Sequence, residues 1–256
     1  MISQAELRDF LELKHDQFNR PEFIPLDPIS VPHRYKNKED IEISGLFAAI
    51  LAWGRRDLIV RAANKFCDGM GQSPYDFVCN ATSRHLETFE GFVYRTFQSG
   101  DARSLLLSLK AVYLQHGGLE QVLSPRPGEP DTRSAIMRFR RMMVSHSGFS
   151  QRTSKHLADP EAGSSAKRLN MFLRWMVRKD NRGVDFGLWA SASPSQLICP
   201  LDVHTGTVGR KLGILQRKQN DWKAALELTE QLRLLDPKDP VKYDFSLFGL
   251  GIEEKF

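Results

Sequence analysis

Between Ser164 and Arg178, apolar residues recur at the spacing of one face of an α-helix, and this periodicity constrains the fold more than any other feature of the chain. The apolar positions are Leu169, Phe172, Leu173, Met176 and Val177. The opposite side of the same helix is polar and mostly cationic, with Lys167, Asn170, Arg174 and Arg178. A helix of this kind buries one stripe and presents the other to water or to a cleft, so we expect Lys167 to lie outside the core.

The rest of the chain is also predicted to be helical. Further helical patterns, separated by Gly, Pro and Asn rather than by alternating strand patterns, cover 9–18, 41–53, 57–70, 74–79, 102–115, 132–144, 222–234 and 242–250. Four prolines between Arg20 and Lys38 predict a connecting arm instead of a long helix. The expected fold class is all-α.

Length and composition fit an ordinary globular protein. The chain has 256 residues, of which 41% are hydrophobic, and a formal net charge of +5 that is compatible with a polyanionic partner. The three cysteines, Cys67, Cys79 and Cys199, lack metal-binding spacing, and no His, Asp or Glu grouping has it either. We expect no metal, no iron–sulfur cluster and a reducing compartment. The acidic N-terminal segment and the lack of a long apolar run predict a cytoplasmic protein without membrane association.

The segment 200–213 places an acid and a histidine at the start of a short basic helix. Asp202 follows Pro200 at the position of an N-cap residue, and the helix closes at Gly213. The helix dipole favours a charged carboxylate at this end and favours Arg210 and Lys211 in the last turn. Taken alone, this pattern indicates simple N-capping by Asp202.

Three motifs, in order along the chain, resemble the helix-hairpin-helix DNA glycosylase superfamily. Residues 46–56, Leu-Phe-Ala-Ala-Ile-Leu-Ala-Trp-Gly-Arg-Arg, are similar to its early buried helix and the polar turn that follows. Residues 163–170, Gly-Ser-Ser-Ala-Lys-Arg-Leu-Asn, resemble the hairpin and helix start where bifunctional members carry a lysine. Residues 200–204, Pro-Leu-Asp-Val-His, resemble the superfamily's Pro-Val-Asp-x-His-like turn. The likeness covers most of the chain, which looks closest to a bacterial family of unknown function within or beside this superfamily.

The resemblance implies a two-lobed, all-α fold with a central cleft. A central helical domain would cover 44–190 and carry the hairpin with Lys167, and a second lobe built from 1–43 plus 191–256 would carry Asp202. The implied activity is base-excision repair by a DNA glycosylase with abasic-site lyase activity. In that activity Lys167 is the nucleophile that forms a Schiff base, and Asp202 supports the developing positive charge. The resemblance implies no cofactor, damaged or abasic DNA as the partner, and a monomer.

Other residues are candidates for contacts with DNA. Candidates near the phosphates or the wedge position are Trp53, Arg55, Arg56, Gly163, Ser164, Arg168, Arg174 and Arg210. Phe186 and Trp189 are candidates for a base pocket, because they adjoin polar turns. His204 is expected to orient Asp202 or to contact a phosphate. For each of these residues the plain alternative is a solvated face or a place in the core.

The hairpin itself departs from the superfamily and keeps two other interpretations open. It reads Leu-Pro-Gly-x-Gly in many relatives, whereas residues 159–163 here are Asp-Pro-Glu-Ala-Gly. Two acids beside a phosphate repel it unless their side chains turn away. One alternative is therefore a non-catalytic helical DNA-binding protein on the same scaffold. The other is a protein-interaction scaffold with no role in nucleic-acid chemistry.

Overall fold

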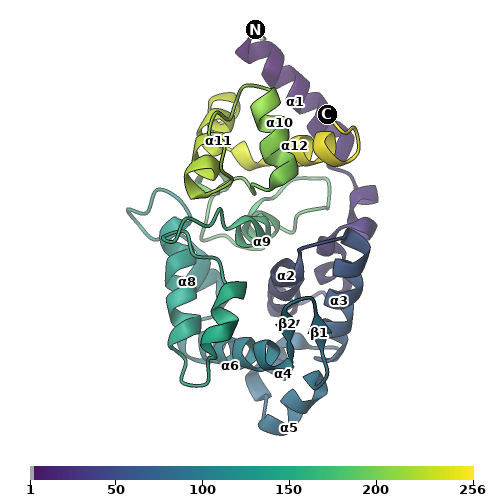
Figure 1. Cartoon of the computed structure of the whole chain (residues 1–256), viewed down its shortest axis with the longest axis vertical. Helices are drawn as coiled ribbons and strands as arrows, with labels where there is room; N and C mark the ends of the chain where they lie inside the picture. Colours follow the sequence, from purple (N-terminus) through teal and green to yellow (C-terminus); the bar gives the residue numbers. More distant parts are fainter. Residues whose placement is uncertain (1–2) are drawn as a thin grey trace. The chain divides into compact units, whose positions relative to one another are not determined.

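The computed structural model describes residues 3–256, and this part of the chain is mostly helical, which confirms the predicted fold class (Figure 1). The α-helices are α1 (Gln4–Phe18), α2 (Lys38–Leu51), α3 (Arg56–Asp68), α4 (Pro74–Asn80), α5 (Ser83–Leu86), α6 (Ser99–His116), α7 (Leu119–Leu123), α8 (Arg133–Ser145), α9 (Lys167–Val177), α10 (Val203–Lys211), α11 (Trp222–Leu235) and α12 (Tyr243–Ile252). Among the described helices, none is both long and apolar enough to cross a membrane.

Short elements account for most differences from the sequence expectation. The proline-rich arm after α1 forms the 3-10 helices η1 (Pro21–Leu26), η2 (Pro28–Ser30) and η3 (Pro32–Arg34). The other 3-10 helices are η4 (Glu87–Phe89), η5 (Gln151–His156), η6 (Pro194–Gln196) and η7 (Pro240–Lys242). An antiparallel hairpin of β1 (Val93–Tyr94) and β2 (Phe97–Gln98) was not predicted, because two-residue strands carry no readable alternation.

The chain divides into two compact units. Unit 1 contains the described chain up to Phe23, Pro127–Arg133 and Asp159–Phe256, and unit 2 contains Ile24–Arg126 and Ser134–Ala158. This division differs from the predicted one, because α9 belongs with the C-terminal helices and not with α2. Phe172 of α9 meets Trp189 edge to face, with ring centroids 5.6 Å apart, and α9 is also paired with α12 through charged side chains. Lys167 and Asp202 therefore lie in one unit.

Unit 2 is built on α2, in which every residue from Asp40 to Leu51 is buried, as the apolar pattern predicted. Phe47 of α2 packs on Phe66 of α3, with ring centroids 4.3 Å apart. Phe66 also meets Phe97 of β2 edge to face at 5.9 Å. These aromatic contacts tie the small hairpin to the hydrophobic core of unit 2.

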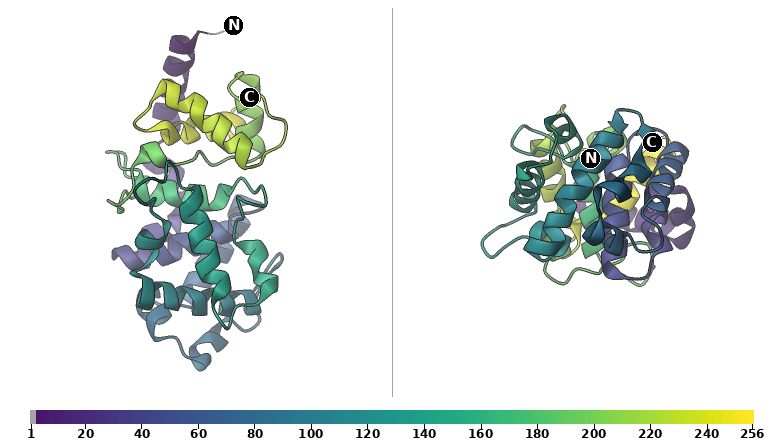
Figure 2. Two further views of the ribbon diagram at one scale, coloured as in Figure 1. Left: turned by 90° about the vertical axis from the view of Figure 1, so that its left-hand side faces the viewer. Right: turned by 90° about the horizontal axis from the view of Figure 1, so that it is seen from below.

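Unit 1 gathers α1, α10, α11 and α12, which lie together in both Figure 1 and Figure 2. Glycines allow α12 to approach its neighbours closely. A Cβ atom at Gly249 would lie 2.2 Å from the Phe18 ring of α1, and one at Gly251 would lie 3.0 Å from the Cβ of His204 in α10. This packing holds α12, whose first turn carries the buried Asp244, inside unit 1.

Candidate active site

The hairpin before α9 is closed by its own acidic residue. One carboxylate oxygen of Asp159 accepts hydrogen bonds from the amides of Glu161 and Ala162, each at 3.1 Å. The Ser164 amide donates to the Asp159 carbonyl at 3.0 Å, and Gly163 has φ +91°, a left-handed conformation that favours glycine. The Asp159 side chain thus turns onto the loop's own N–H groups. The Gly163 and Ser164 amides are also used within the turn, so neither offers the free donor expected for a phosphate.

The residues after the hairpin hold the start of α9 beside the Asp202 turn. Ser165 Oγ donates to the carbonyl of Leu201 at 3.2 Å, and the Trp222 amide donates to the carbonyl of Gly163 at 3.1 Å. Ala166, the residue before α9, is buried and left-handed with φ 51°. An alanine is rarely stable in this conformation, so the surrounding contacts determine where Lys167 leaves the backbone.

Lys167 and Asp202 form an ion pair across these two segments. Lys167 Nζ lies 3.8 Å from Asp202 Oδ2, and the two side chains are 24% and 25% exposed. The same ammonium group lies 3.6 Å from Met171 Sδ, one turn further along α9. The predicted pair of residues is therefore brought together, and both members remain accessible to a ligand.

Asp202 caps α10 with one oxygen and faces the lysine with the other. Its Oδ1 accepts a hydrogen bond from the Thr205 amide at 3.0 Å, which confirms the predicted N-cap. Asn220 Nδ2 donates to the Asp202 carbonyl at 3.0 Å and holds the turn from the opposite side. The cap thus orients Oδ2 towards Lys167 without consuming it.

The polar stripe of α9 continues into the interior, which corrects the expectation that this face meets water or a cleft. Arg174 is 4% exposed and pairs with Asp185, at 3.3 Å, and with Asp244. Arg178 is 2% exposed and pairs with Asp185 at 3.1 Å and with Asp180 at 2.6 Å. Carboxylates from the loop after α9 and from α12 neutralise these cations, so burial is possible. Arg174 is therefore unavailable to DNA.

Asp244 was not identified from the sequence. Its carboxylate is buried, and burial raises its pKa to about 6, an effect that the charges of Arg174 and Lys167 partly oppose and that of Asp202 reinforces. The charges of Lys167 and Asp202, the two members of the accessible pair, therefore both affect the pKa of Asp244. A signal was present, because an acid inside the otherwise apolar run 243–250 is rarely buried without a cationic partner.

Two more predicted DNA contacts have structural roles. The Arg210 guanidinium donates to the carbonyls of Arg217, at 2.7 and 2.9 Å, and Lys218, at 2.9 Å, and to Asn220 Oδ1 at 2.6 Å. It braces the loop between α10 and α11. Trp189 is 3% exposed and packs on Phe172, so it belongs to the core and not to a base pocket.

The remaining candidates in unit 1 are exposed or half-buried. His204 is exposed in the first turn of α10, and none of the hydrogen bonds recorded for residues 3–256 joins it to Asp202. Arg168 follows Lys167 on α9 and is half-buried, and desolvation lowers its pKa. Phe186 is half-buried, and its amide donates to the Trp175 carbonyl at 2.9 Å.

Three candidates, Trp53, Arg55 and Arg56, belong to unit 2. Trp53 is half-buried after the end of α2, and Arg55 is exposed and pairs with Asp57 at 3.0 Å. Arg56 begins α3 and is half-buried.

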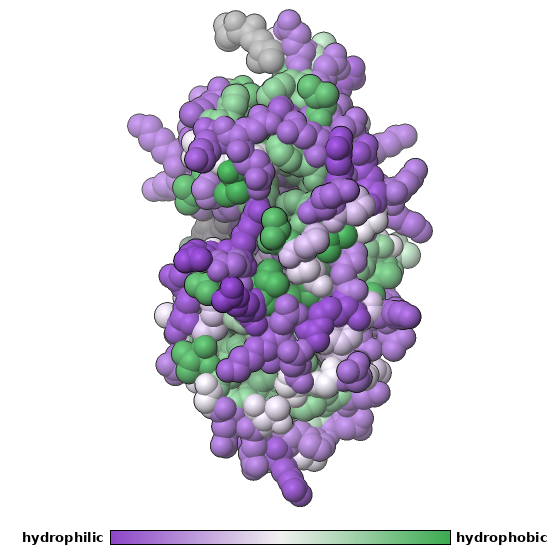
Figure 3. Space-filling view, turned by 90° about the vertical axis from the view of Figure 1, so that its right-hand side faces the viewer, coloured by the Kyte–Doolittle hydropathy of each residue, from purple (hydrophilic) through white to green (hydrophobic). Residues whose placement is uncertain are grey.

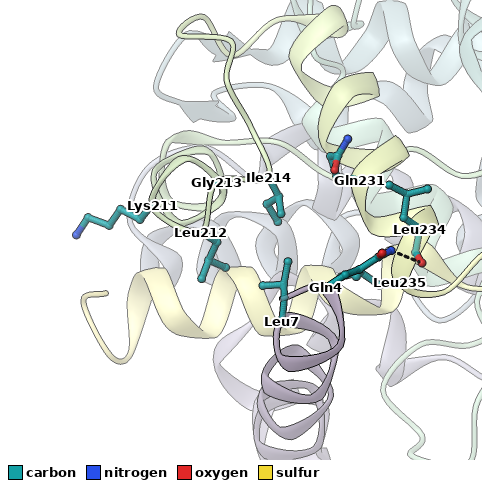
Figure 4. Close-up of a pocket in the computed structure, with 9 residues that line it drawn as sticks. All are labelled: Gln4, Leu7, Lys211, Leu212, Gly213, Ile214, Gln231, Leu234 and Leu235. Atoms are coloured by element: carbon teal, nitrogen blue, oxygen red, sulfur yellow. Dashed lines mark hydrogen bonds between the residues drawn. The ribbon is translucent and has the colours of Figure 1, made fainter. Parts of the chain in front are cut away.

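A surface cavity of about 500 Å³ lies in unit 1 away from the pair (Figure 4). Its lining comes from α1, α11 and the end of α10, with Gln4, Leu7, Lys211, Leu212, Gly213, Ile214, Gln231, Leu234 and Leu235. Asp202 stands at the opposite end of α10, a nine-residue helix about 14 Å long. The cavity is therefore separate from the candidate site. Within residues 3–256, no group of three or more His, Cys, Asp or Glu side chains is placed to hold a metal ion.

Fold and site together define a mostly helical protein with a partly exposed lysine–aspartate pair at the starts of two helices. The chain belongs to the family described as "Protein of unknown function (DUF2400)", whose model matches residues 27–253. The matched region includes Lys167, Asp202 and Asp244. No curated protein and no solved structure matches the chain.

Proposed function

We propose that this protein is a DNA base-excision glycosylase with abasic-site lyase activity, on a scaffold like that of the helix-hairpin-helix glycosylases. The observation that carries the proposal is the 3.8 Å separation of Lys167 Nζ and Asp202 Oδ2, with about a quarter of each side chain exposed. An amine and a carboxylate at this separation are suited to attack on a sugar carbon with proton transfer. The proposed partner is damaged or abasic DNA, bound by a monomer in the cytoplasm.

The first step is displacement of the base. Lys167 must lose a proton to attack, and the Asp202 carboxylate is placed to accept it, because apo catalytic contacts commonly tighten when substrate binds. A bond forms between Nζ and the sugar C1′ while the bond from C1′ to the base breaks. The base leaves with the bonding electrons and takes up a proton. Asp202 supplies that proton, and its carboxylate, ionised again, stabilises the positive charge that develops at C1′.

The second step cleaves the strand. The bond from C1′ to the ring oxygen opens, the oxygen takes a proton, and C1′ and Nζ become a Schiff base. Removal of a C2′ proton then drives elimination of the 3′ phosphate, which departs with the electrons of the C3′–O bond. Water hydrolyses the Schiff base and returns Lys167 as a free amine.

The buried pairs below Lys167 position it for this chemistry. Arg174 lies two turns from Lys167 on α9 and joins that helix to Asp244 of α12. A helix held in this way cannot rotate without leaving buried charges unpaired, which is costly. The nucleophile therefore stands on a rigid element, as efficient sites require.

A second candidate function is that of a non-catalytic DNA-binding protein on the same scaffold. The closed hairpin favours it, because Asp159 already accepts the Glu161 and Ala162 amides. A phosphate at that turn would have to displace a carboxylate of the same charge. Binding of DNA without any covalent intermediate would support this alternative over the glycosylase.

Reductive trapping separates the two candidates. The wild-type protein, Lys167→Ala and the matched control Lys223→Ala, an exposed lysine on α11, are each incubated with an abasic-site duplex and borohydride. We expect a covalent protein–DNA band for the wild type and for Lys223→Ala, and none for Lys167→Ala. Equal trapping by all three proteins, or by none of them, would remove the proposed nucleophile.

A further inference from the structure

A cluster in unit 2 brings three arginines, two exposed and one half-buried, close to an indole ring. Arg95, at the turn of the β1–β2 hairpin, places its guanidinium carbon 4.6 Å from the centre of the Trp53 ring. Arg55 and Arg56 follow Trp53 directly in the sequence, across Gly54. We call these four side chains, Trp53, Arg55, Arg56 and Arg95, the Trp53–Arg95 patch.

The hairpin is fixed firmly enough to hold Arg95 in this place. Tyr94 Oη donates to the Trp53 carbonyl at 2.9 Å, and Arg152 Nη2 donates to the Thr96 carbonyl at 2.9 Å. Phe97 is fully buried in the aromatic core of unit 2. The turn therefore cannot move away from the end of α2 without breaking contacts on both strands.

The backbone near Arg95 is arranged around its side chain. Gly54 has φ +110°, and a Cβ atom there would lie 2.8 Å from Arg95 Nη1, so glycine leaves the space that the guanidinium occupies. Arg95 itself has φ 54°, a left-handed conformation that is unfavourable for a residue with a side chain. Trp53 Nε1 is buried and has no hydrogen-bond partner among the described residues. Strained backbone and unsatisfied donors that persist side by side are typical of functional sites.

The guanidinium of Arg95 is exposed and, within residues 3–256, has no carboxylate partner. A planar cation backed by an aromatic ring accepts a nucleobase on its free face, and neighbouring arginines accept phosphates. Hydrophilic side chains predominate on the side of unit 2 that carries α3 (Figure 3). An acidic peptide would satisfy the charges of the patch but would leave the stacked plane unused.

We propose that the Trp53–Arg95 patch binds a DNA strand with an unpaired base, which stacks on Arg95 while flanking phosphates contact Arg55 and Arg56. The inference rests on the proposed DNA substrate but is independent of the lysine chemistry. It adds Arg95 and the β1–β2 hairpin, which no sequence motif indicated, to the residues that contact the substrate.

The test is binding of a fluorescent single-stranded oligonucleotide, followed by anisotropy, to the full-length protein. Arg95→Ala should raise Kd about tenfold, because loss of one stacked contact has an effect of that order. Arg95→Lys keeps the positive charge but lacks the planar guanidinium group, and should raise Kd about fivefold. The control Arg84→Ala removes another exposed charge, on α5 of the same unit, and should change Kd less than twofold.

Competition and trapping complete the design. Unlabelled oligonucleotide should displace the probe at a concentration at which poly-glutamate of equal charge does not. With saturating abasic DNA, Arg95→Ala should still form the borohydride-trapped adduct, so a failure of Lys167 chemistry and a failure of the patch are separable. Equal Kd values for Arg95→Ala and Arg84→Ala, full recovery in Arg95→Lys, or displacement by poly-glutamate would each overturn the proposal.

Discussion

The polar stripe of α9 has cationic side chains paired with carboxylates at both of its ends, but the two ends differ in burial. At one end, Lys167 and Asp202 are a quarter exposed and 3.8 Å apart, and each has an atom that faces the other. At the other end, Arg174 and Arg178 are almost fully buried, and each contacts more than one carboxylate. The multiply paired end can only stabilise the fold. The loosely paired end retains the freedom to exchange its partner for a substrate.

Removal of a buried cation should have the largest effect and would show the structural character of the inner end. Arg174→Ala removes the guanidinium that pairs with the buried Asp244 and leaves Asp185 with Arg178 alone, so we expect a loss of about 3–5 kcal/mol in the free energy of unfolding. Urea denaturation followed by tryptophan fluorescence measures it. Lys167→Ala, at the outer end, should change the same quantity by less than about 0.5 kcal/mol. Equal losses of unfolding free energy in the two variants would show that the inner and outer ends contribute equally to stability.

Substitution of Asp202 separates its cap from its chemistry. Asparagine is also a good N-cap, so Asp202→Asn should keep stability within about 0.5 kcal/mol while trapping of abasic DNA slows about 100-fold. Asp202→Ala should slow trapping equally and also lose about 1 kcal/mol of stability, since the Thr205 amide loses its acceptor. Full activity in Asp202→Asn would restrict this residue to a capping role.

Substitution of Arg210 tests whether this cation contributes to DNA binding or to the stability of the fold. Because its guanidinium braces the loop before α11, Arg210→Ala should lower stability by about 2 kcal/mol. Its effect on the Kd for single-stranded DNA should stay below twofold in the same anisotropy assay. A clear loss of DNA binding with unchanged stability would return Arg210 to the predicted phosphate contacts.

A further prediction concerns the pH dependence of stability. The pKa of Asp244 is raised to about 6 by burial, so its contribution is present below its ordinary pKa and is lost as pH rises towards 6. Burial and the charge of Arg178 lower the pKa of His15 to about 4, so the His15 contribution is lost as pH falls from 6.5 to 4. Between about pH 4 and 6, the Asp244 and His15 contributions therefore change stability in opposite directions as pH rises.

Asp244→Asn removes one of these opposing contributions. Its urea midpoint, measured between pH 4 and 6, should therefore rise with pH more steeply than that of the wild type. Parallel curves for the two proteins would show that Asp244 does not titrate in this range.

Much of the helical architecture could be predicted, because long apolar periods report burial directly. The pattern over 164–178 predicts α9, and the acid after Pro200 predicts the cap of α10. Whether the polar stripe of α9 is buried or exposed could not be predicted in the same way. Its burial depends on Asp185, in the loop after α9, and on Asp239 and Asp244, which lie 61 and 70 residues from the arginines they pair with.

The candidate site was predicted in its two main residues but not in its environment. Lys167 and Asp202 were identified by motif, and the local contacts of Ser165 and Asn220 bring them together. The place of Arg95 beside Trp53 could not be predicted because it depends on a two-residue hairpin, and Arg174 was misjudged because a cation on a helix is usually solvated. In both cases the decisive partner comes from elsewhere in the chain.

The most direct test of the central claim is to map the covalent adduct formed with abasic DNA under borohydride. The trapped protein is digested and its modified peptide is sequenced by mass spectrometry. We predict that the sugar remnant is attached to Lys167, at the accessible end of the stripe, and that Asp202→Asn reduces its yield. Attachment to another lysine, or the absence of any adduct from wild-type protein, would contradict the assignment of the Lys167–Asp202 pair as the reactive site.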